Sequence, residues 1–248
     1  MNEATRQLLD GASAAAKQAL FNYLLELTTP AKRERMQEVL DWRTRYLTVV
    51  LEDIYHPHNA SACVRSCECF GIQDLHIIEE EMDFRPVRHI GLGANQWLSL
   101  HHHTSTEQCL SDMKAQDYHI AAMTLREGSI PIQQLPITGK IALCFGTEET
   151  GLSETAHGLA DSQVYIPMQG FTRSFNISVT VALALFELGH KLRATSLPWQ
   201  LSSEEKRALQ LDWLVQAQTN DDILVRNFLE RFSALEKTAK SAENAKNY

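Results

Sequence analysis

Between residues 47 and 192, short apolar runs rich in β-branched residues alternate with segments of helical character. Such alternation predicts parallel strands joined by helices that cover the faces of one sheet. We therefore expect an α/β fold, a parallel sheet flanked by helices. The expected strands are LTVVLEDI (47–54), DLHIIE (74–79), WLSLHH (97–102), YHIAAMTL (118–125), KIALCFG (140–146) and QVYIPM (163–168). The expected helices are 59–70, 105–115, 153–159 and 175–192, with Thr104 as a candidate cap of the second.

The first 45 residues predict helix without strand. Leucines and alanines recur near helical spacing over residues 3–27, which indicates one helix. Thr29 is placed to cap a second helix, which begins at Pro30 and runs to about Arg45. We expect residues 1–45 to form an α-helical N-terminal extension.

The residues after Pro198 also predict helices. One helix is expected over 202–218, with two glutamates in its first turn, and another over 221–236. The polar end of the chain, 238–248, predicts a frayed terminus. We expect a main domain over 46–195 and an α-helical C-terminal extension over 196–248.

The formal net charge of this 248-residue chain is −8. No apolar run approaches the roughly 20 residues that a membrane-spanning helix needs. The charged N-terminus also lacks the apolar segment of a secretory signal. We expect a cytoplasmic protein with no membrane partner.

The cysteine and histidine pattern does not favour a metal centre. Five cysteines without a CxxC pair are typical of reduced thiols. The run His101-His102-His103 could supply ligands, but consecutive strand residues point to alternate faces, so the three cannot easily converge. An exposed strand end is the interpretation that we favour, and we predict no metal.

The acidic net charge argues against a broadly basic nucleic-acid surface, so an RNA partner would need locally gathered cations. One group of neighbouring basic residues is present, and acidic residues lie among its members. A solvated helix face and an RNA footprint explain it equally well. Its members are Lys32, Arg33, Arg35, Arg43 and Arg45.

Three polar segments follow expected strands. NASACVR (59–65) opens a helix, and a helix cap plus a surface arginine would explain it. FGTEETG (145–151) follows a buried strand but lacks the residues of a phosphate-binding loop. Its two glutamates favour a cationic or hydroxyl-bearing ligand over a phosphate, although a tight turn with solvated glutamates is the plainer alternative.

The third segment, IPMQGFTRSFNIS, spans residues 166–178. Asn176 is placed to cap the helix that follows, and Arg173 and Ser174 lie where helix N-terminal amides favour an anion. Each segment alone is a weak signal. Because all three lie at strand ends of one sheet, they could meet in space.

The three segments resemble, in this order, the three motifs of the SpoU/TrmH branch of the SPOUT methyltransferases. NASACVRSCECFGI resembles the first motif, FGTEETGLS the second, and IPMQGFTRSFNISVTVALALFEL the third, IPMxGxxxSLNVSVAxxxxxFE. The similarity covers roughly residues 29–215 and is greatest to the tRNA-specific TrmH group. It implies a deep C-terminal trefoil knot at about 140–195, an exception to the rule that protein chains are unknotted.

The resemblance also implies S-adenosylmethionine as cofactor, tRNA as partner, and methylation of a ribose 2′-hydroxyl, at a D-loop guanosine for the TrmH group. It further implies a homodimer, which we expect to form through the apolar helix 175–192. The catalytic positions it implies are Asn59, Arg65, Glu148, Ser174 and Asn176. The cofactor positions it implies are Thr124, Gly146, Ile166, Met168 and Phe175.

The chemistry of this reaction is mostly positioning, because a sulfonium methyl donor is already electrophilic. Asn59 would orient groups, and Glu148 would organise hydrogen bonds near Arg65 or Asn176. The resemblance implies that Arg65 removes the proton of the 2′-hydroxyl. A guanidinium is normally not deprotonated in proteins, so Arg65 could instead hold the adjacent phosphate and stabilise the developing alkoxide.

The sequence departs from the family pattern at the end of the third motif. The family helix usually ends FEAQRQR, and this one reads FELGHKLR, with His190 and Leu192 at the two arginine positions. We therefore expect RNA contacts to shift to other cations. The expected RNA-binding residues are Lys32, Arg33, Arg35, Arg43, Arg45, Arg173, Lys191 and Arg193.

Three alternatives remain open at this level. The first is a 2′-O-methyltransferase for ribosomal RNA or another tRNA position. The second is an RNA-binding relative with little turnover, which the changed helix end and the acidic charge would favour. The third is a metal-dependent hydrolase built on the histidine run, which would require stoichiometric metal.

Overall fold

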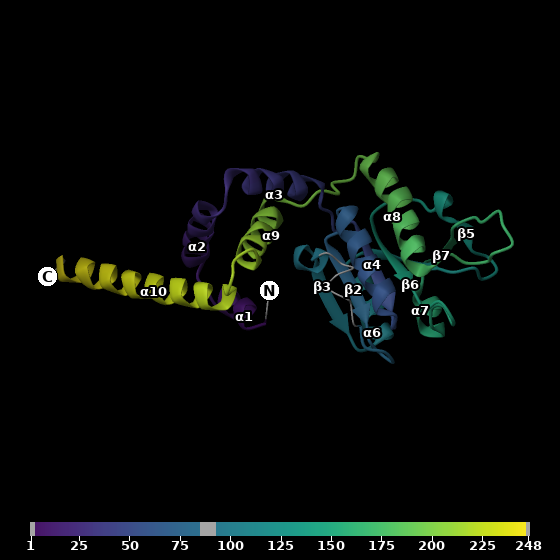
Figure 1. Ribbon diagram of the computed structural model, residues 1–248, viewed down its shortest axis with the longest axis horizontal. Helices are drawn as coiled ribbons and strands as arrows, with labels where there is room; N and C mark the ends of the chain where they lie inside the picture. The colour runs from purple at the N-terminus through teal and green to yellow at the C-terminus, as the bar shows by residue number, and fades with distance from the viewer. Residues whose placement is uncertain (1–2, 85–92, 247–248) are drawn as a thin grey trace. The chain divides into compact units, whose positions relative to one another are not determined.

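The computed structural model describes residues 3–84 and 93–246, with side chains up to residue 238. The chain divides into two compact units (Figure 1). The first combines Met1–Asp41 with Ser202–Tyr248, and the second is Trp42–Leu201. Both helical extensions therefore contribute to one unit, and the segment between them forms the other.

The second unit contains a seven-stranded parallel sheet in the order β3-β2-β1-β6-β4-β7-β5, which confirms the predicted α/β fold. The order places β1 and β6 at the centre, and both consist almost entirely of buried residues. The strands are β1 (Leu47–Glu52), β2 (Asp74–Ile78), β3 (Ser99–His103), β4 (Tyr118–Met123), β5 (Ile130–Pro131), β6 (Lys140–Phe145) and β7 (Ser162–Tyr165).

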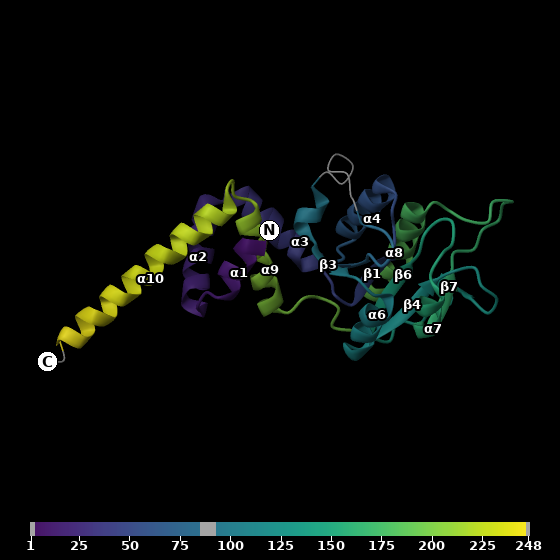
Figure 2. The ribbon, with the colours of Figure 1, turned by 90° about the horizontal axis from the view of Figure 1, so that it is seen from below.

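Helices cover both faces of this sheet, because the strand side chains are apolar on both sides. Figure 2 shows α4 (Pro57–Cys69) and α8 (Ile177–Arg193) on one side, and α6 (Thr106–Ala115) and α7 (Glu154–Leu159) on the other. Val49 and Leu51 of β1 pack in the cluster under α4 and α8, whereas Val50 packs in the cluster under α6 and α7. Two short 3-10 turns, η1 (Ala94–Trp97) and η2 (Ile132–Gln134), complete this unit.

Several boundaries differ from the sequence prediction. Helix α4 begins at Pro57, a favoured first helical position, so Asn59 lies inside the helix and is not its cap. Ser105, rather than Thr104, caps α6 by accepting a hydrogen bond from the amide of Gln108. Strand β7 ends at Tyr165, two residues before a proline that cannot donate to a strand ladder.

The two-residue strand β5, which the sequence did not predict, pairs with β7. Asn176 caps α8, as predicted, and its side chain accepts a hydrogen bond from the amide of Ser178 at 2.9 Å. The 11 residues between Tyr165 and Ile177 thus form an irregular segment, which leaves their main chain available to line a site.

The first unit is helical throughout its described residues. The predicted helix 3–27 is two helices, because Ser13 caps a new helix by accepting from the amide of Ala16. Residues 202–205 form the capping box that their sequence indicates. The helices are α1 (Glu3–Asp10), α2 (Ala14–Leu27), α3 (Pro30–Trp42, whose last residue falls in the second unit), α9 (Ser203–Gln216) and α10 (Asp221–Lys246).

The prediction of a frayed C-terminus was wrong, because α10 continues to Lys246. Its last part is rich in alanine, lysine and glutamate, all good helix formers, and contains no glycine or proline. The first part of α10 is held by packing, with the Phe228 ring stacked on Tyr23 at 5.2 Å between centroids. Within the described part of the chain, no helix is long and apolar enough to cross a membrane.

Candidate active site

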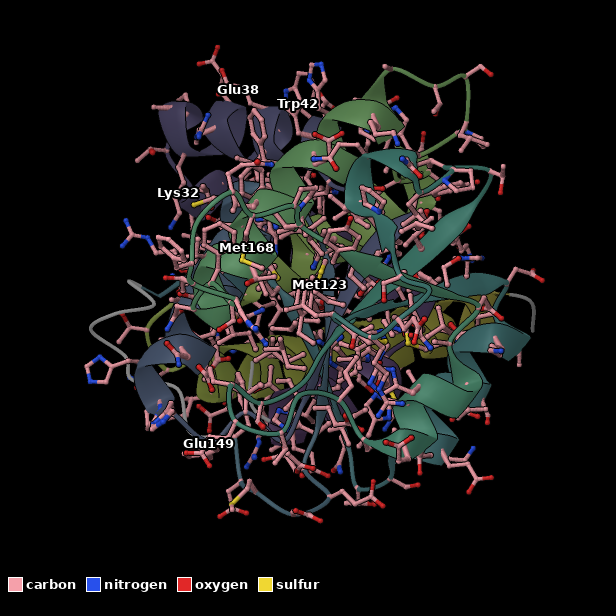
Figure 3. The ribbon with its side chains drawn as sticks, turned by 90° about the vertical axis from the view of Figure 1, so that its right-hand side faces the viewer. Lys32, Glu38, Trp42, Met123, Glu149 and Met168 are labelled. Carbon is pink, nitrogen blue, oxygen red and sulfur yellow. The ribbon has the colours of Figure 1, made fainter. Side chains whose placement is uncertain are left out.

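A cavity of about 430 Å³ opens at the carboxyl ends of β4, β6 and β7. Parallel strands bring these ends to one edge of the sheet, which is where α/β proteins form ligand sites. Met123 and Met168 lie close together in the view of Figure 3, and both line the cavity, as does Glu149. All five expected cofactor residues line it as well, namely Thr124, Gly146, Ile166, Met168 and Phe175.

The loop after β6 forms one wall of this cavity. It is closed by two main-chain hydrogen bonds of 3.1 Å between Thr147 and Gly151, and the amide of Thr150 donates to Thr147 Oγ1 at 3.0 Å. A Cβ atom at position 146 would overlap the carbonyl of Gly151. Gly146 is therefore required by this closed loop, independently of any ligand.

Gly146→Ala is expected to open the closed loop, because the added methyl group and the Gly151 carbonyl cannot occupy the same space. We expect the affinity for S-adenosylmethionine to fall at least about tenfold, measured by calorimetry. Gly139→Ala is the matched control, because a Cβ atom there would meet no atom within 4 Å. Equal affinities of the two variants would contradict this account of the loop.

A buried carboxylate that the sequence analysis did not single out anchors the far end of the same loop. Glu52, at the end of β1, is only 4% exposed. It accepts hydrogen bonds from the Ser153 amide at 2.8 Å, the Ser153 hydroxyl at 2.7 Å and the Thr106 hydroxyl at 2.6 Å. These bonds satisfy a charge that would otherwise be costly to bury. The sequence signal that could have pointed to this role is a glutamate at the end of an otherwise apolar strand.

A chain of hydrogen bonds joins the three polar segments. Asn59 Nδ2 donates to Glu148 Oε1, and Asn176 Nδ2 donates to Asn59 Oδ1 at 3.0 Å. The side-chain oxygen Oδ1 of Asn176 in turn accepts from the Ser178 amide. Asn59 lies on α4, Glu148 in the loop after β6, and Asn176 at the start of α8. The convergence expected from the sequence is therefore confirmed for these three residues.

A second link between the same loops was not foreseen. The Tyr55 hydroxyl donates to Glu149 Oε1 at 3.3 Å, across the carboxyl ends of the central strands β1 and β6. Glu148 and Glu149 thus each hold a partner from the segment that follows β1. Both glutamates also line the cavity, which gives that wall a negative charge.

Ser174 and Arg173 line the cavity, but Arg65 is not among the described residues that do so. Arg65 is exposed on α4, six residues beyond Asn59. At 100° per residue, six residues carry a side chain about 240° around a helix, so Asn59 and Arg65 cannot share one helix face. The expected constellation therefore converges within one chain except for its arginine.

Two of the expected RNA-binding residues donate hydrogen bonds within the second unit. Arg43 is fully buried, and its guanidinium donates to the Ile72 carbonyl at 2.9 Å and to Glu68 at 3.0 Å. Arg193 donates to the carbonyls of Gly189 and Phe70, and burial lowers its pKa. The inclusion of Arg43 in a surface footprint was wrong, because its side chain is buried in the second unit. Arg193 is only partly buried, and its place in the footprint stays a prediction.

The remaining expected cations differ in their engagement. Arg45 forms an ion pair with Asp74 at 2.5 Å, and Lys191 donates to two main-chain carbonyls, at 2.8 and 2.9 Å. In the first unit Arg33 donates to the Thr28 carbonyl. Lys32 and Arg35 are exposed, and Arg35 forms a surface ion pair with Glu38 on the same helix, so these two stay available to a polyanion.

Comparison with known proteins gives a consistent picture. The profile of the SpoU rRNA Methylase family matches residues 46–186. A tRNA (guanosine(18)-2′-O)-methyltransferase of Borreliella burgdorferi is 40% identical over 197 residues, which are 79% of this chain and 90% of that protein. The counterpart of Thermus thermophilus is 33% identical over 189 residues, 75% of this chain and 97% of that protein.

A solved structure resembles this chain along most of its length. The crystal structure of the A. aeolicus TrmH/SpoU tRNA modifying enzyme superposes with a TM-score of 0.70 and 28% identity, covering 77% of this chain and 98% of that one. The segment that the family profile matches, residues 46–186, contains the sheet, the cavity and the three joined polar segments. This chain belongs to the SpoU rRNA methylase family.

Proposed function

We propose that the protein is an S-adenosylmethionine-dependent RNA 2′-O-ribose methyltransferase that acts on tRNA, at the D-loop guanosine 18. The observation that carries the proposal is the hydrogen-bonded chain from Glu148 through Asn59 to Asn176 beside the cavity. The relatives that align with most of this chain are named tRNA (guanosine(18)-2′-O)-methyltransferase, which supports the choice of tRNA and of that guanosine.

The cavity fits S-adenosylmethionine in its chemistry. Met123, Ile166 and Met168 supply an apolar surface for a flat purine, and the main chain around Gly146 can meet its polar edges. Glu148 and Glu149 give the cavity carboxylates that would suit a cationic cofactor. When bound, this cofactor supplies an electrophilic methyl group on a sulfonium sulfur.

The residues of the chain then have positioning roles. Glu148 and Asn176 fix the two ends of the Asn59 amide, so that this amide holds one orientation. Ser174 and Arg173 line the cavity beside them and can hold the ribose and its phosphate. We assign Arg65 the stabilisation of the developing alkoxide, or the acceptance of its proton, once it reaches a bound ribose.

The test is methyl transfer to unmodified tRNA transcripts, followed by mass mapping of the methylated nucleoside. We expect 2′-O-methylguanosine at position 18 and no transfer when that ribose already carries a methyl group. Methylation of a different position or only of ribosomal RNA would favour another target. Cofactor binding without any transfer would favour the RNA-binding alternative.

We also propose a homodimer formed through α8, in a chain whose residues 140–195 form the trefoil knot of this family. The support is an apolar stripe on α8 and its cap that one chain leaves open. Its members share one helix face and are Phe175 (41% exposed), Val179 (44%), Leu183 (39%) and Phe186 (63%). Soluble proteins rarely leave such a contiguous stripe open to water unless it meets a partner.

Val179→Glu combined with Phe186→Glu is expected to convert the dimer into a monomer, because two charges would be buried at the interface. Light scattering after size exclusion measures the change. Leu235→Glu, on the exposed side of α10, is the control and should stay dimeric. A double variant of unchanged mass would exclude α8 as the interface.

We propose that Lys32 and Arg35 contribute to tRNA binding, as exposed cations of the first unit. Reversing both charges, in Lys32→Glu with Arg35→Glu, should weaken binding. The slope of log affinity against log salt should fall by about 1 for each lost phosphate contact. Arg231→Glu is the control, an exposed cation of the same unit. Unchanged affinity and slope in the double variant would refute this footprint.

A further inference from the structure

A cluster of two histidines and a cysteine lies on the α6 face of the sheet, at its β3 edge. The parallel register pairs His76 with His101 and Ile78 with His103, so His76, His101 and His103 point to the same face. His102 points to the other face and contacts Glu79. Alternation along β3 therefore places His102 on the opposite face of the sheet from His101 and His103. It leaves His103 on the same face as His76.

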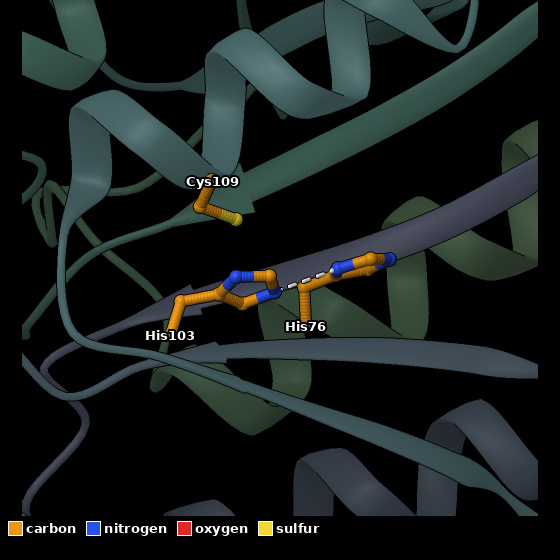
Figure 4. Close-up of side chains that lie close together, drawn as sticks. All are labelled: His76, His103 and Cys109. Carbon is orange, nitrogen blue, oxygen red and sulfur yellow. Dashed lines mark hydrogen bonds between the residues drawn. The ribbon is translucent and has the colours of Figure 1, made fainter.

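Cys109 completes this cluster from above the sheet. It lies on the inward side of α6, fully buried, one helical turn after the Ser105 cap. One ligand atom from each of His76, His103 and Cys109 lies within 4.8 Å of the other two. Figure 4 shows the two imidazoles side by side with the cysteine sulfur above them.

The distances match those of a metal site. His76 Nδ1 and His103 Nε2 form a hydrogen bond of 3.1 Å, which a bound metal ion would replace. Two imidazole nitrogens on a tetrahedral zinc ion, each at about 2.0–2.1 Å, lie roughly 3.3 Å from each other. A thiolate bound to the same ion would approach within about 3.6 Å of each nitrogen. Since the ligand atoms already lie within 4.8 Å of one another, the sulfur needs to move by at most about 1 Å.

A neighbouring histidine, His101, fixes the orientation of the His76 ring. His101 contacts Asp74 at 3.1 Å and stacks on His76 at 4.7 Å between centroids, so it orients His76 and is itself occupied.

We propose that His76, His103 and Cys109 bind one Zn²⁺ ion, which joins β2, β3 and α6 at the edge of the sheet. Binding forms two Zn–N bonds and one Zn–S bond, and the thiol proton leaves to the buffer. A water molecule takes the fourth position. Two imidazoles and one thiolate form a ligand set that zinc prefers over magnesium or calcium.

This site is separate from the candidate active site. None of its three residues is among the described residues that line the cavity. When bound, the ion would tie the edge strand β3 and its following helix to the sheet. The inference therefore does not depend on the proposed methyltransferase function, and the two can fail separately.

The experiment uses the full chain, prepared without metal and titrated with Co²⁺ and then Zn²⁺. We expect one Co²⁺ per chain, with visible d–d bands and a thiolate-to-cobalt charge-transfer band that Zn²⁺ displaces. His103→Gln and Cys109→Ser should each weaken Zn²⁺ binding at least about tenfold, since each removes a ligand. Zn²⁺ should also raise the melting temperature of the unaltered chain.

The matched controls are His102→Gln, on the opposite face of the same strand, and Cys69→Ser, an exposed thiol on α4. Both should bind Zn²⁺ like the unaltered chain. Cys109 is a core residue, so far-ultraviolet circular dichroism checks that its variant folds, and His103→Gln gives an independent test. Absence of the charge-transfer band, or equal Zn²⁺ affinity in the ligand and control variants, would overturn the proposal.

Discussion

Arg65→Lys is expected to lose nearly all methyl transfer, by a factor of about 10²–10³, while S-adenosylmethionine still binds. Lysine keeps the charge but not the planar fork that can hold a phosphate and an oxyanion together. Cofactor binding should survive because Arg65 is not among the described cavity-lining residues. Single-turnover methylation of tRNA and calorimetry with the cofactor measure the two effects separately.

Arg126→Lys is the control for this change. Arg126 is an exposed arginine of the same unit, paired with Glu154, and it has no assigned role in the reaction. Its variant should methylate tRNA at the normal rate. Normal turnover by Arg65→Lys would exclude both roles considered for this side chain, as proton acceptor and as alkoxide stabiliser.

The exposure of Arg65 leads to a sharper version of the same experiment. If α8 forms the dimer interface, we expect this arginine to act in the cavity of the partner chain, since it faces away from Asn59 on its own α4. A mixed dimer of Arg65→Ala and Asn176→Ala chains would then hold one intact site. Recovery of about half the activity supports action across the interface, and no recovery supports action within one chain.

Asn59→Ala is expected to lower the rate of methyl transfer about a hundredfold with little loss of stability. It removes both hydrogen bonds that join the three polar segments, to Glu148 and from Asn176. Misplacing the reacting groups costs the transition state more free energy than folding loses with one hydrogen bond. One hydrogen bond contributes only roughly 0.5–1.5 kcal/mol to folding. Alanine also favours the interior of a helix, where Asn59 lies.

Asn59→Asp separates orientation from simple loss of a side chain. The aspartate can still accept from Asn176, but it cannot donate to Glu148 and adds a second negative charge beside it. We expect it to be no more active than Asn59→Ala. Thermal unfolding of the same variants distinguishes an orienting role of Asn59 from a packing role. A large fall in melting temperature with a proportionate loss of activity would indicate the packing role.

The sheet was predictable because its evidence is local. The apolar runs at 47–54, 74–79 and 140–146 each contain a strand of the structure. Alternation with helices then requires parallel pairing, which brings the polar ends of the strands to one edge. The convergence of Asn59, Glu148 and Asn176 follows from that topology, and the resemblance to known motifs identified which side chains to expect there.

The errors concern properties that depend on packing. Arg43 belongs to a basic group in the sequence, but its partners Glu68 and Ile72 lie more than 24 residues further along the chain. Whether a cation is buried depends on such distant contacts. The role of Arg65 stays a prediction, since a motif records spacing along the chain and not which face of a helix meets the site.

The sequence by itself determined the fold class, the family and most residues of the candidate active site, because strand periodicity and long motifs are written in neighbouring residues. Only the tertiary structure decided which side chains meet across elements: the Asn59 amide held between Glu148 and Asn176, the buried Arg43, and His76 beside His103 and Cys109. The physical reason is strand register. A shift of one residue would turn His76 to the opposite face of the sheet, and no local pattern in the sequence fixes that pairing.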